Sequence, residues 1–442
     1  MIEKSNFYIF SAGDTKYIFS GFTGLLLVYN KRIEEFLNDP NSDDNELKEH
    51  LIGTSSASEK SYYHEKPYLK TITVFTTNQC NLSCSYCYGK INNLDEAKRM
   101  DLKVFKDGIE YFLKNFDYGD YVNIFYFGGE PLLNFPLIKD SVDLLGKLEK
   151  LYNVVFSYSI TSNGTILNKE IKDFLTNNNF KIMISIDGDR LTHDSQRKFL
   201  NGKGSFAIII QNIHELSKYT EIFARTTLLN LDTDLIQLYE TLLPHGVKEF
   251  DLELASEKNG YLERKKDLQK LSNRLHLFAN YFIEQLKDKQ LVRLRNLIRI
   301  LSSIHYGCKK TPKDYPCGAG NSTYALAVNG DIYLCHRFNN ISEYRWGNIY
   351  QGFQVEKRQE FLNRHIMSLR DSSRCANCWA RYLCGGTCYN TSYFADNQTE
   401  RISENHCFFN KEIIKNALYI YASIPEKERI IFDNIRSEYR QD

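Results

Sequence analysis

The sequence lacks both a long apolar run and a surplus of charge. Apolar stretches such as GLLLVY and FAIII are far too short to span a bilayer, and the start, MIEKSNFYIFSAGD, carries no signal-peptide pattern. Lys and Arg number 56 and Asp and Glu 55, which leaves a net charge of +1. This balance gives no indication of bulk binding to nucleic acid or to an anionic membrane. We therefore expect a cytoplasmic protein whose partners are neither nucleic acids nor membranes.

Cysteine is absent between residues 88 and 307, although the chain of 442 residues contains 11 cysteines. Three lie close together, and the other eight fall within residues 308–407. Cytosolic thiols stay reduced, and clustered cysteines there bind metal more often than they pair. The distribution predicts two cysteine-bearing modules on either side of a cysteine-free body.

The cysteine-free body alternates between strand-like and helical patterns. The strand-like runs are TITVFTT, YVNIFYFGG, NVVFSYSITSNG, FKIMISIDGD, IFARTTLLN and VKEFDLELA, and the helical ones include LKVFKDGIEYFLKNF and LIKDSVDLLGKLEKLY. Regular alternation of this kind predicts an α/β fold in which a parallel sheet has helices outside it, either as a partial or full barrel or as an open sheet. Such sheets carry their chemistry on the loops after the strand C-termini.

The flanking segments predict smaller units. Residues 1–53 hold two strand-like runs, TKYIFS and GLLLVY, and then a helix capped by Asn30 with an apolar stripe of Ile33, Phe36 and Leu37. The Ser-rich stretch 54–67 is typical of a linker. Residues 265–305 are predicted to be helical, short strands surround the turn Asn329-Gly330, and an amphipathic helix, KEIIKNALYIYA, lies near the end.

The triplet Cys80, Cys84 and Cys87 follows the first predicted strand of the body with the spacing C-x3-C-x2-C. Three thiolates can bind three irons of a 4Fe–4S cluster, whereas a closed electron-transfer cluster normally takes four. The triplet therefore indicates a cluster with one open iron. A three-thiolate zinc site or incidental thiols are the alternatives.

The triplet, the aromatic residue before its last cysteine and the segment FGGEP at residues 127–131 resemble the radical S-adenosylmethionine (radical SAM) enzymes. That resemblance implies a partial (β/α)6 barrel. It also implies that the open iron binds SAM, that reduction gives a 5′-deoxyadenosyl radical, and that this radical removes hydrogen from a substrate. Cys80, Cys84 and Cys87 would then be the catalytic cluster ligands.

The same resemblance implies a set of SAM contacts at matching positions. Turn formation is the alternative for the polar members of the set, since Asp-Gly and Asn-Gly are good turn formers. Two glycines would let the backbone approach the cofactor, and an arginine would pair with the methionine carboxylate. The implied contacts are Tyr86, Gly128, Gly129, Glu130, Pro131, Asn163, Ser185, Asp187 and Arg225.

The second cysteine set resembles the SPASM extension of radical SAM enzymes, which binds two auxiliary 4Fe–4S clusters. Taken alone, C-x2-C-x5-C-x3-C also fits a zinc knuckle or ribbon. The resemblance implies that the ligands of the two clusters interleave along the chain. Cys308 is the candidate fourth ligand of the inner cluster; without it, one iron of that cluster stays open. The outer cluster would have Cys375, Cys378, Cys384 and Cys407, and the inner cluster Cys317, Cys335 and Cys388.

The segment CGAGNSTYALAVNGDIYLCHRF is similar to maturases of ribosomally made peptides that form thioether cross-links, the sactipeptide and ranthipeptide type. This similarity implies a precursor peptide whose leader binds a winged-helix-like α+β domain at the N-terminus, and a reductant such as flavodoxin or ferredoxin. The alternative for that N-terminal unit is a plain capping subdomain. The expected domains are 1–70 for leader binding and linker, 71–300 for the radical SAM core, 301–410 for SPASM and 411–442 for a helix and tail.

Other functions stay open at this point. Sulfatase-maturing relatives place an Asp after the position of Cys335, and this chain has His336 there, which counts against sulfatase maturation. His336 would either transfer protons or pack beside the cluster. Carbon–carbon cross-linking and epimerisation leave the triplet unchanged. A non-catalytic iron–sulfur or zinc scaffold that binds peptides is the contrasting class.

Overall fold

The computed structural model describes residues 4–39, 43–53, 66–89, 98–255, 265–307, 315–371 and 373–433. Its main feature is a ten-stranded sheet in which six parallel strands, adjacent in chain order, extend from the middle to one edge. These strands are β4 (Tyr68–Thr77), β5 (Asp117–Gly128), β6 (Val155–Ser162), β7 (Lys181–Ser185), β8 (Ile222–Leu228) and β9 (Val247–Leu254). The predicted α/β class and parallel sheet are confirmed.

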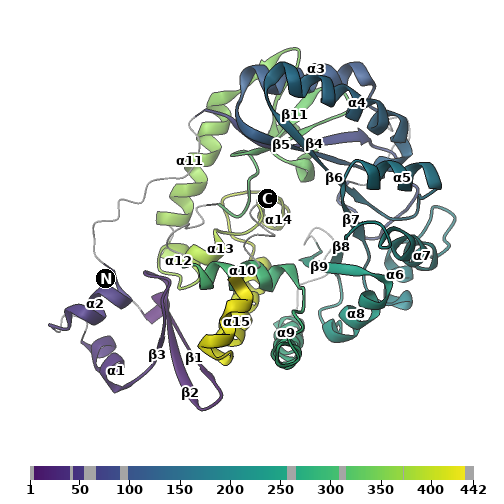
Figure 1. Cartoon of the computed structure of the whole chain (residues 1–442). Helices are drawn as coiled ribbons and strands as arrows, with labels where there is room; N and C mark the ends of the chain where they lie inside the picture. The colour runs from purple at the N-terminus through teal and green to yellow at the C-terminus, as the bar shows by residue number, and fades with distance from the viewer. Residues whose placement is uncertain are drawn as a thin grey trace.

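Helices connect the parallel strands and cover the outside of the curved sheet (Figure 1). They are α3 (Leu102–Asn115), α4 (Phe135–Tyr152), α5 (Lys169–Asn177), α6 (Arg190–Gln196), α7 (Phe206–Leu216) and α8 (Leu235–Leu242). Several begin at the side-chain cap that their sequence supplies: Asp101 accepts from the N–H of Val104, and Asn168 accepts from that of Ile171. The core between sheet and helices is apolar, and Ile72, Ile124 and Ile182 are buried in it.

The sheet does not close on itself, because β4 pairs on its other side with a strand from the C-terminal third of the chain. That strand, β10 (Thr323–Leu326), runs parallel to β4 and pairs Leu326 with Val74. A turn at Asn329-Gly330 leads into β11 (Asp331–Tyr333), as the sequence predicts, and β12 (Arg345–Asn348) and β13 (Gly352–Phe353) continue the sheet. The C-terminal module is therefore fixed to the barrel by backbone pairing.

Two long helices follow the barrel and support the end of the chain. α9 (Lys265–Lys287) and α10 (Arg295–His305) both pack against α15 (Glu404–Ser423). The cysteine-rich segment between β13 and α15 is mostly helical. It contains α11 (Val355–Asp371), α12 (Ser373–Ala376), α13 (Arg381–Cys384) and α14 (Tyr389–Asp396).

The N-terminal unit lies beside this module, at the lower left of Figure 1. It contains a three-stranded antiparallel sheet and two helices: β1 (Phe7–Ala12), β2 (Thr15–Ser20), β3 (Leu26–Val28), α1 (Lys31–Asn38) and α2 (Asn45–Leu51). The cap at Asn30 and the buried stripe of Ile33 and Phe36 agree with the sequence, whereas β1 is an additional strand. The predicted linker lies almost entirely outside the described residues.

One tryptophan connects the N-terminal unit to the C-terminal module. The Trp379 ring stacks on Tyr8 with centroids 4.5 Å apart, and its backbone N–H donates to the carbonyl of Ser5 at 2.9 Å. Since Trp379 directly follows Cys378, the N-terminal sheet contacts the cysteine-bearing segment itself.

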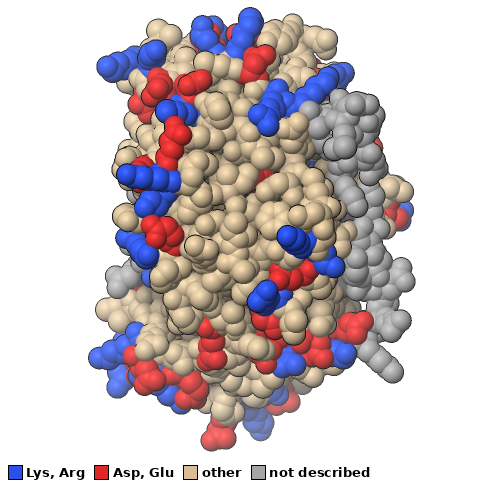
Figure 2. All heavy atoms as spheres, turned by 90° about the vertical axis from the view of Figure 1, so that its right-hand side faces the viewer, with Lys and Arg blue, Asp and Glu red and all other residues tan. Residues whose placement is uncertain are grey.

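Positive and negative side chains share the surface of the described parts. Figure 2 shows Lys and Arg side chains interspersed with Asp and Glu over the face that it draws, in keeping with the net charge of +1. No helix within the described ranges is both long enough and apolar enough to cross a membrane.

Candidate functional site: three groups of cysteines

The loop that carries Cys80, Cys84 and Cys87 starts where β4 ends and is held against the end of β5. The backbone N–H of Gly129 donates to the carbonyl of Thr77 at 3.0 Å, and that of Glu130 donates to the carbonyl of Gln79 at 2.8 Å. A Cβ on Gly128 would lie 2.2 Å from the Thr77 oxygen, and a Cβ on Gly129 would lie 2.2 Å from the Gln79 oxygen. The close approach that these glycines permit is therefore to the cysteine loop itself.

The opposite side of the same loop pairs with residues 196–200. The N–H of Ser83 donates to the carbonyl of Lys198 at 2.7 Å, and the N–H of Ser85 donates to the carbonyl of Gln196 at 3.0 Å. The loop is thus held between two backbone segments from distant parts of the barrel, and this fixes the spacing of its thiols.

Tyr86, inside the triplet, is anchored by a buried ion pair. Its hydroxyl donates to the carboxylate of Asp187, which also accepts from Arg197 Nε at 2.8 Å and from the backbone N–H of Thr227 at 3.0 Å. The Arg197 guanidinium lies 5.1 Å from the centroid of the Tyr86 ring. Asp187 and Arg197 are 2% and 7% exposed, so each depends on the other for a charge partner. The sequence interpretation includes Asp187 but misses Arg197.

Glu130 is completely buried, and its carboxylate points to the end of β6. It accepts hydrogen bonds from the backbone N–H groups of Leu132 and Asn163 and from the hydroxyl of Ser162, at 2.7–3.1 Å. Burial raises the pKa of Glu130 to about 7, although these three donors act against the shift. Asn163 in turn donates to Asn81 at 2.8 Å and approaches Cys80 Sγ at 3.8 Å. Glu130 and Asn163 therefore connect three strand ends around the cysteine loop.

The remaining implied SAM contacts lie on neighbouring strands. Ser185 ends β7 and is paired in register with Arg225 of β8. The Arg225 guanidinium makes ion pairs with Asp251 and, at 2.6 Å, with Glu253, both on β9. Tyr88, next to Cys87, contacts the C-terminal module: its ring centroid is 6.5 Å from that of His336 and 5.7 Å from the Arg337 guanidinium.

The thiols of the triplet lie near one another. Burial and, to a smaller extent, the neighbouring Glu130, Cys84 and Cys87 together raise the pKa of Cys80 to about 12. Burial likewise raises the pKa of Cys84 to about 11, with Cys87 adding to the shift and Arg197 opposing it.

The C-terminal cysteines form two further groups from segments far apart in the sequence. Burial first, and then the nearby thiols of Cys388 and Cys317, raise the pKa of Cys335, so these three form an inner group. Cys378 and Cys407 act on Cys384 in the same way and form an outer group with it. The backbone carbonyl of Cys375 accepts a hydrogen bond from the backbone N–H of Cys378, three residues later, at 3.1 Å. Cys308 lies outside the described residues.

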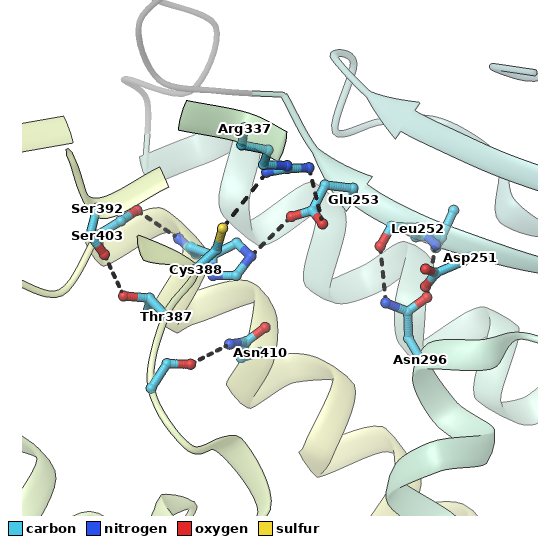
Figure 3. Close-up of polar contacts among 12 residues, drawn as sticks. Asp251, Leu252, Glu253, Asn296, Arg337, Thr387, Cys388, Ser392, Ser403 and Asn410 are labelled. Atoms are coloured by element: carbon cyan, nitrogen blue, oxygen red, sulfur yellow. Dashed lines mark hydrogen bonds and ion pairs between the residues drawn. The ribbon is translucent and has the colours of Figure 1, made fainter. Parts of the chain in front are cut away.

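The surroundings of these sulfurs fit iron–sulfur clusters. Asn410 Nδ2 lies 3.5 Å from Cys384 Sγ. Arg337 Nη1 lies 3.8 Å from Cys388 Sγ (Figure 3). The buried hydroxyl of Tyr389 has no hydrogen-bond partner within the described ranges and lies near all three inner thiols. A cluster sulfur there would accept a hydrogen bond from this hydroxyl. Within the same ranges, no group of three His, Cys, Asp or Glu side chains is arranged so that it could hold a single metal ion. A cubane binds each thiolate at a different iron, so its ligands need not converge on one point.

His336 packs within an aromatic group at the inner face of the sheet. Its ring centroid is 4.7 Å from that of Phe127 and 6.1 Å from that of Phe125. Burial lowers the pKa of His336 to about 3, and Arg337 adds to this shift. Of the two roles expected for His336, packing is the one for which the structure supplies contacts.

The comparisons with known proteins agree with this geometry. The model of the Radical SAM superfamily matches residues 74–242. An uncharacterised protein of Methanocaldococcus jannaschii is 33% identical over 281 residues, which cover 62% of this chain and 87% of that protein. A cysteine-type anaerobic sulfatase-maturating enzyme of Clostridium novyi is 27% identical over 329 residues, or 71% of this chain and 85% of that enzyme.

Two solved structures share the fold. Native anSMEcpe with bound AdoMet and a Cp18Cys peptide matches with a TM-score of 0.68 at 20% identity, covering 84% of this chain and 100% of that one. Streptococcus suis SuiB bound to its precursor peptide SuiA matches with a TM-score of 0.50 at 14% identity, covering 92% of this chain and 99% of that one.

Replacing Gly129 by Ala tests the contact between the β5 end and the cysteine loop. The new Cβ would overlap the Gln79 carbonyl, so we expect a loss of about 1–3 kcal/mol in stability and a displaced loop that binds less iron. Gly146→Ala is the matched control, because that exposed position on α4 has no atom within 4 Å of a new Cβ and alanine favours a helix by up to about 1 kcal/mol. Thermal unfolding and iron analysis of both variants measure the difference. Equal behaviour would contradict the role given to Gly129.

Replacing Asp187 by Asn leaves the buried Arg197 without a charge partner. We expect a loss of about 3–5 kcal/mol in the free energy of unfolding, measured by denaturant titration. Asp189→Asn, two residues away, should be nearly neutral because asparagine caps helix α6 as well as aspartate does. A cost for Asp187→Asn no larger than that of the control would show that the ion pair does not hold Tyr86.

Proposed function

Because this chain belongs to the radical SAM superfamily, we propose that it is a peptide maturase that links a cysteine sulfur to a carbon atom of a ribosomally made precursor peptide. Membership of the superfamily implies SAM and an iron–sulfur cluster. When bound, the cluster supplies the electron that cleaves SAM, and the resulting 5′-deoxyadenosyl radical removes hydrogen from the substrate. Cys80, Cys84 and Cys87 would hold this cluster, leaving one iron for SAM.

The observation that carries the proposal is the arrangement of the triplet and the inner cysteine group around Tyr88. Tyr88 is next to Cys87 in sequence, and its ring lies 6.5 Å from the ring of His336, which directly follows Cys335, and 5.7 Å from the guanidinium of Arg337. A substrate held between these two groups would have the SAM site on one side and an auxiliary cluster on the other. The proposal includes two auxiliary clusters, three clusters in all, at the inner and outer cysteine groups, and a flavodoxin or ferredoxin as the electron source.

The proposed SAM contacts lie at or just after the ends of β5, β6 and β7, with Tyr86 in the loop after β4 and Arg225 in the middle of β8. The backbone of Gly128–Pro131 and the side chain of Asn163 border the cysteine loop, with Ser185 on the next strand. Asp187 already accepts from three groups, so its main role in this proposal is to hold Tyr86. Arg225 is paired with Asp251 and Glu253, and a methionine carboxylate would compete with them for its donors.

The N-terminal sheet offers an edge for the leader peptide. The N–H of Ser20 donates to the carbonyl of Leu25, and the N–H of Tyr29 donates to that of Lys16, at 3.0 and 2.8 Å. Backbone groups alternate in direction along a strand, so those of Leu26 and Val28 face the free edge of β3. Leu25 and Val28 are also 41% and 55% exposed. A peptide could add here as a further strand.

Sulfatase maturation is the second candidate, favoured by the identity to the Clostridium novyi enzyme and by the fold shared with anSMEcpe. His336 follows Cys335, where the resemblance to sulfatase-maturing enzymes implies an Asp, and its imidazole is packed against Phe127. This substitution removes a carboxylate from the site and favours a different peptide substrate. Carbon–carbon linkage and epimerisation remain alternatives within the same radical chemistry.

Incubation with SAM, a reductant and a cysteine-containing peptide encoded beside this gene tests the proposal. We expect 5′-deoxyadenosine and a peptide lighter by two hydrogen atoms, with fragmentation blocked inside the new ring, as read by mass spectrometry. Replacing Cys80, Cys84 and Cys87 together by Ala should abolish both products. A colourless zinc protein that forms no 5′-deoxyadenosine, or conversion of a sulfatase peptide alone, would contradict the proposal.

Replacing Val28 by Pro tests the leader edge. Proline removes an N–H that faces outward and leaves the pairing with β2 in place, so we expect weaker leader binding. Fluorescence anisotropy of a labelled leader measures this, and formation of 5′-deoxyadenosine without peptide should be unchanged. Val28→Thr keeps the N–H and serves as the control. Equal leader affinity in the two variants would place the leader elsewhere.

A further inference from the structure

Arg337 links the inner cysteine group to the barrel. It lies two residues after Cys335, and its Nη1 approaches Cys388 Sγ at 3.8 Å while its Nη2 lies 3.5 Å from Glu253 (Figure 3). Its guanidinium is also 5.7 Å from the centroid of the Tyr88 ring. The arginine is thus in contact with a thiol, a carboxylate and an aromatic ring at once.

The carboxylate of Glu253, at the end of β9, contacts the side chains of two arginines and one histidine. Besides Arg337, it pairs with Arg225 at 2.6 Å and with His406 Nε2 at 3.1 Å. Its side chain is 17% exposed. Burial opposes ionisation of Glu253, but Arg337, His406 and Arg225 outweigh it and hold the pKa of the carboxyl far below its usual range. The ionised carboxylate of Glu253 therefore determines the orientation of the Arg337 guanidinium.

The position of His406 extends this contact to the outer group, since His406 precedes Cys407 on α15. The carboxylate of Glu253 thus contacts Arg225 of the barrel, Arg337 beside the inner group and His406 beside the outer group. Asn296 holds the neighbouring backbone of Leu252 with two hydrogen bonds, at 2.8 and 2.9 Å, and so fixes the end of β9 (Figure 3).

We propose that Arg337 raises the reduction potential of the inner auxiliary cluster by donating to the Cys388 thiolate, and that Glu253 is the positioning residue that aims it. The inference rests on the proposed function, since it takes Cys317, Cys335 and Cys388 as cluster ligands. Reduction adds one negative charge to a cluster, and a nearby guanidinium with a hydrogen bond to sulfur stabilises that charge. The potential is therefore higher with Arg337 in place.

A higher potential suits the electron left over in thioether formation. After hydrogen abstraction, the substrate carbon carries one unpaired electron. When the cysteine sulfur bonds to this carbon, its thiol proton leaves and one electron must depart. Cys317, Cys335 and Cys388 would hold the oxidised cluster that, when bound, takes up this one electron without gaining an atom. A cluster held at too low a potential would accept that electron poorly.

Redox titration followed by electron paramagnetic resonance tests the inference. The background is the full chain with Cys80, Cys84 and Cys87 replaced by Ala, so that only auxiliary clusters contribute. In that background Arg337→Gln should shift one of two midpoint potentials to more negative values and leave the other in place. Arg337→Lys keeps the charge and should shift it less. Arg345→Gln, a half-exposed arginine paired with Asp331, is the matched control and should shift neither.

Glu253→Asp keeps the carboxylate charge but shortens its reach, so it loosens the aim of Arg337 and should shift the same potential in the same direction. This variant also decides the question if Arg337→Gln fails to load iron. Unchanged potentials in Glu253→Asp, or in Arg337→Gln at full iron content, would overturn the inference. If the background protein itself holds no iron, the proposed function fails instead, and the two failures are thereby distinguished.

Discussion

The positions of the three thiols depend on the backbone contacts that hold the cysteine loop between the end of β5 and residues 196–200. A loop of polar residues and thiols has little apolar surface of its own to bury, so its shape must come from neighbours. Gly128 and Gly129 permit the contact on one side because any Cβ there would overlap the carbonyls of Thr77 and Gln79. Asp187 and Arg197 secure Tyr86 on the other side. Thiol spacing, and with it any cluster chemistry, follows from this double support.

A second constraint brings the C-terminal cysteines to the same place. Pairing of β10 with β4 extends the sheet into the C-terminal module, and the turn at Asn329-Gly330 returns the chain to Cys335. Tyr88, beside Cys87, then contacts His336 and Arg337 of the module, and Arg337 pairs with Glu253 of the barrel. The N-terminal unit joins the assembly through Trp379. The barrel, the cysteine module and the N-terminal unit therefore share one set of contacts around the cysteine groups.

Local patterns made much of this predictable. The six parallel strands follow from alternating apolar runs, and the Asn30 cap and the turn at Asn329-Gly330 follow from residue type alone. The three cysteine groups stay predictions from resemblance, and the thiols of Cys388 and Cys317 both add to the rise in the pKa of Cys335 although 71 positions separate them. By contrast, the pairs Asp187–Arg197 and Glu253–Arg337 join residues whose charges look ordinary in the sequence. Burial gives these pairs their importance, and burial depends on the tertiary fold. The same holds for Gly128 and Gly129, whose close neighbour is the cysteine loop.

The central claim is that Cys80, Cys84 and Cys87 hold a cluster whose open iron binds SAM. The most direct measurement is electron paramagnetic resonance with hyperfine detection on the reduced protein, before and after addition of SAM labelled with ¹⁵N at the methionine amino group. The account predicts a changed cluster signal with coupling to the labelled nitrogen. A signal that stays the same while SAM is bound to the protein would contradict it.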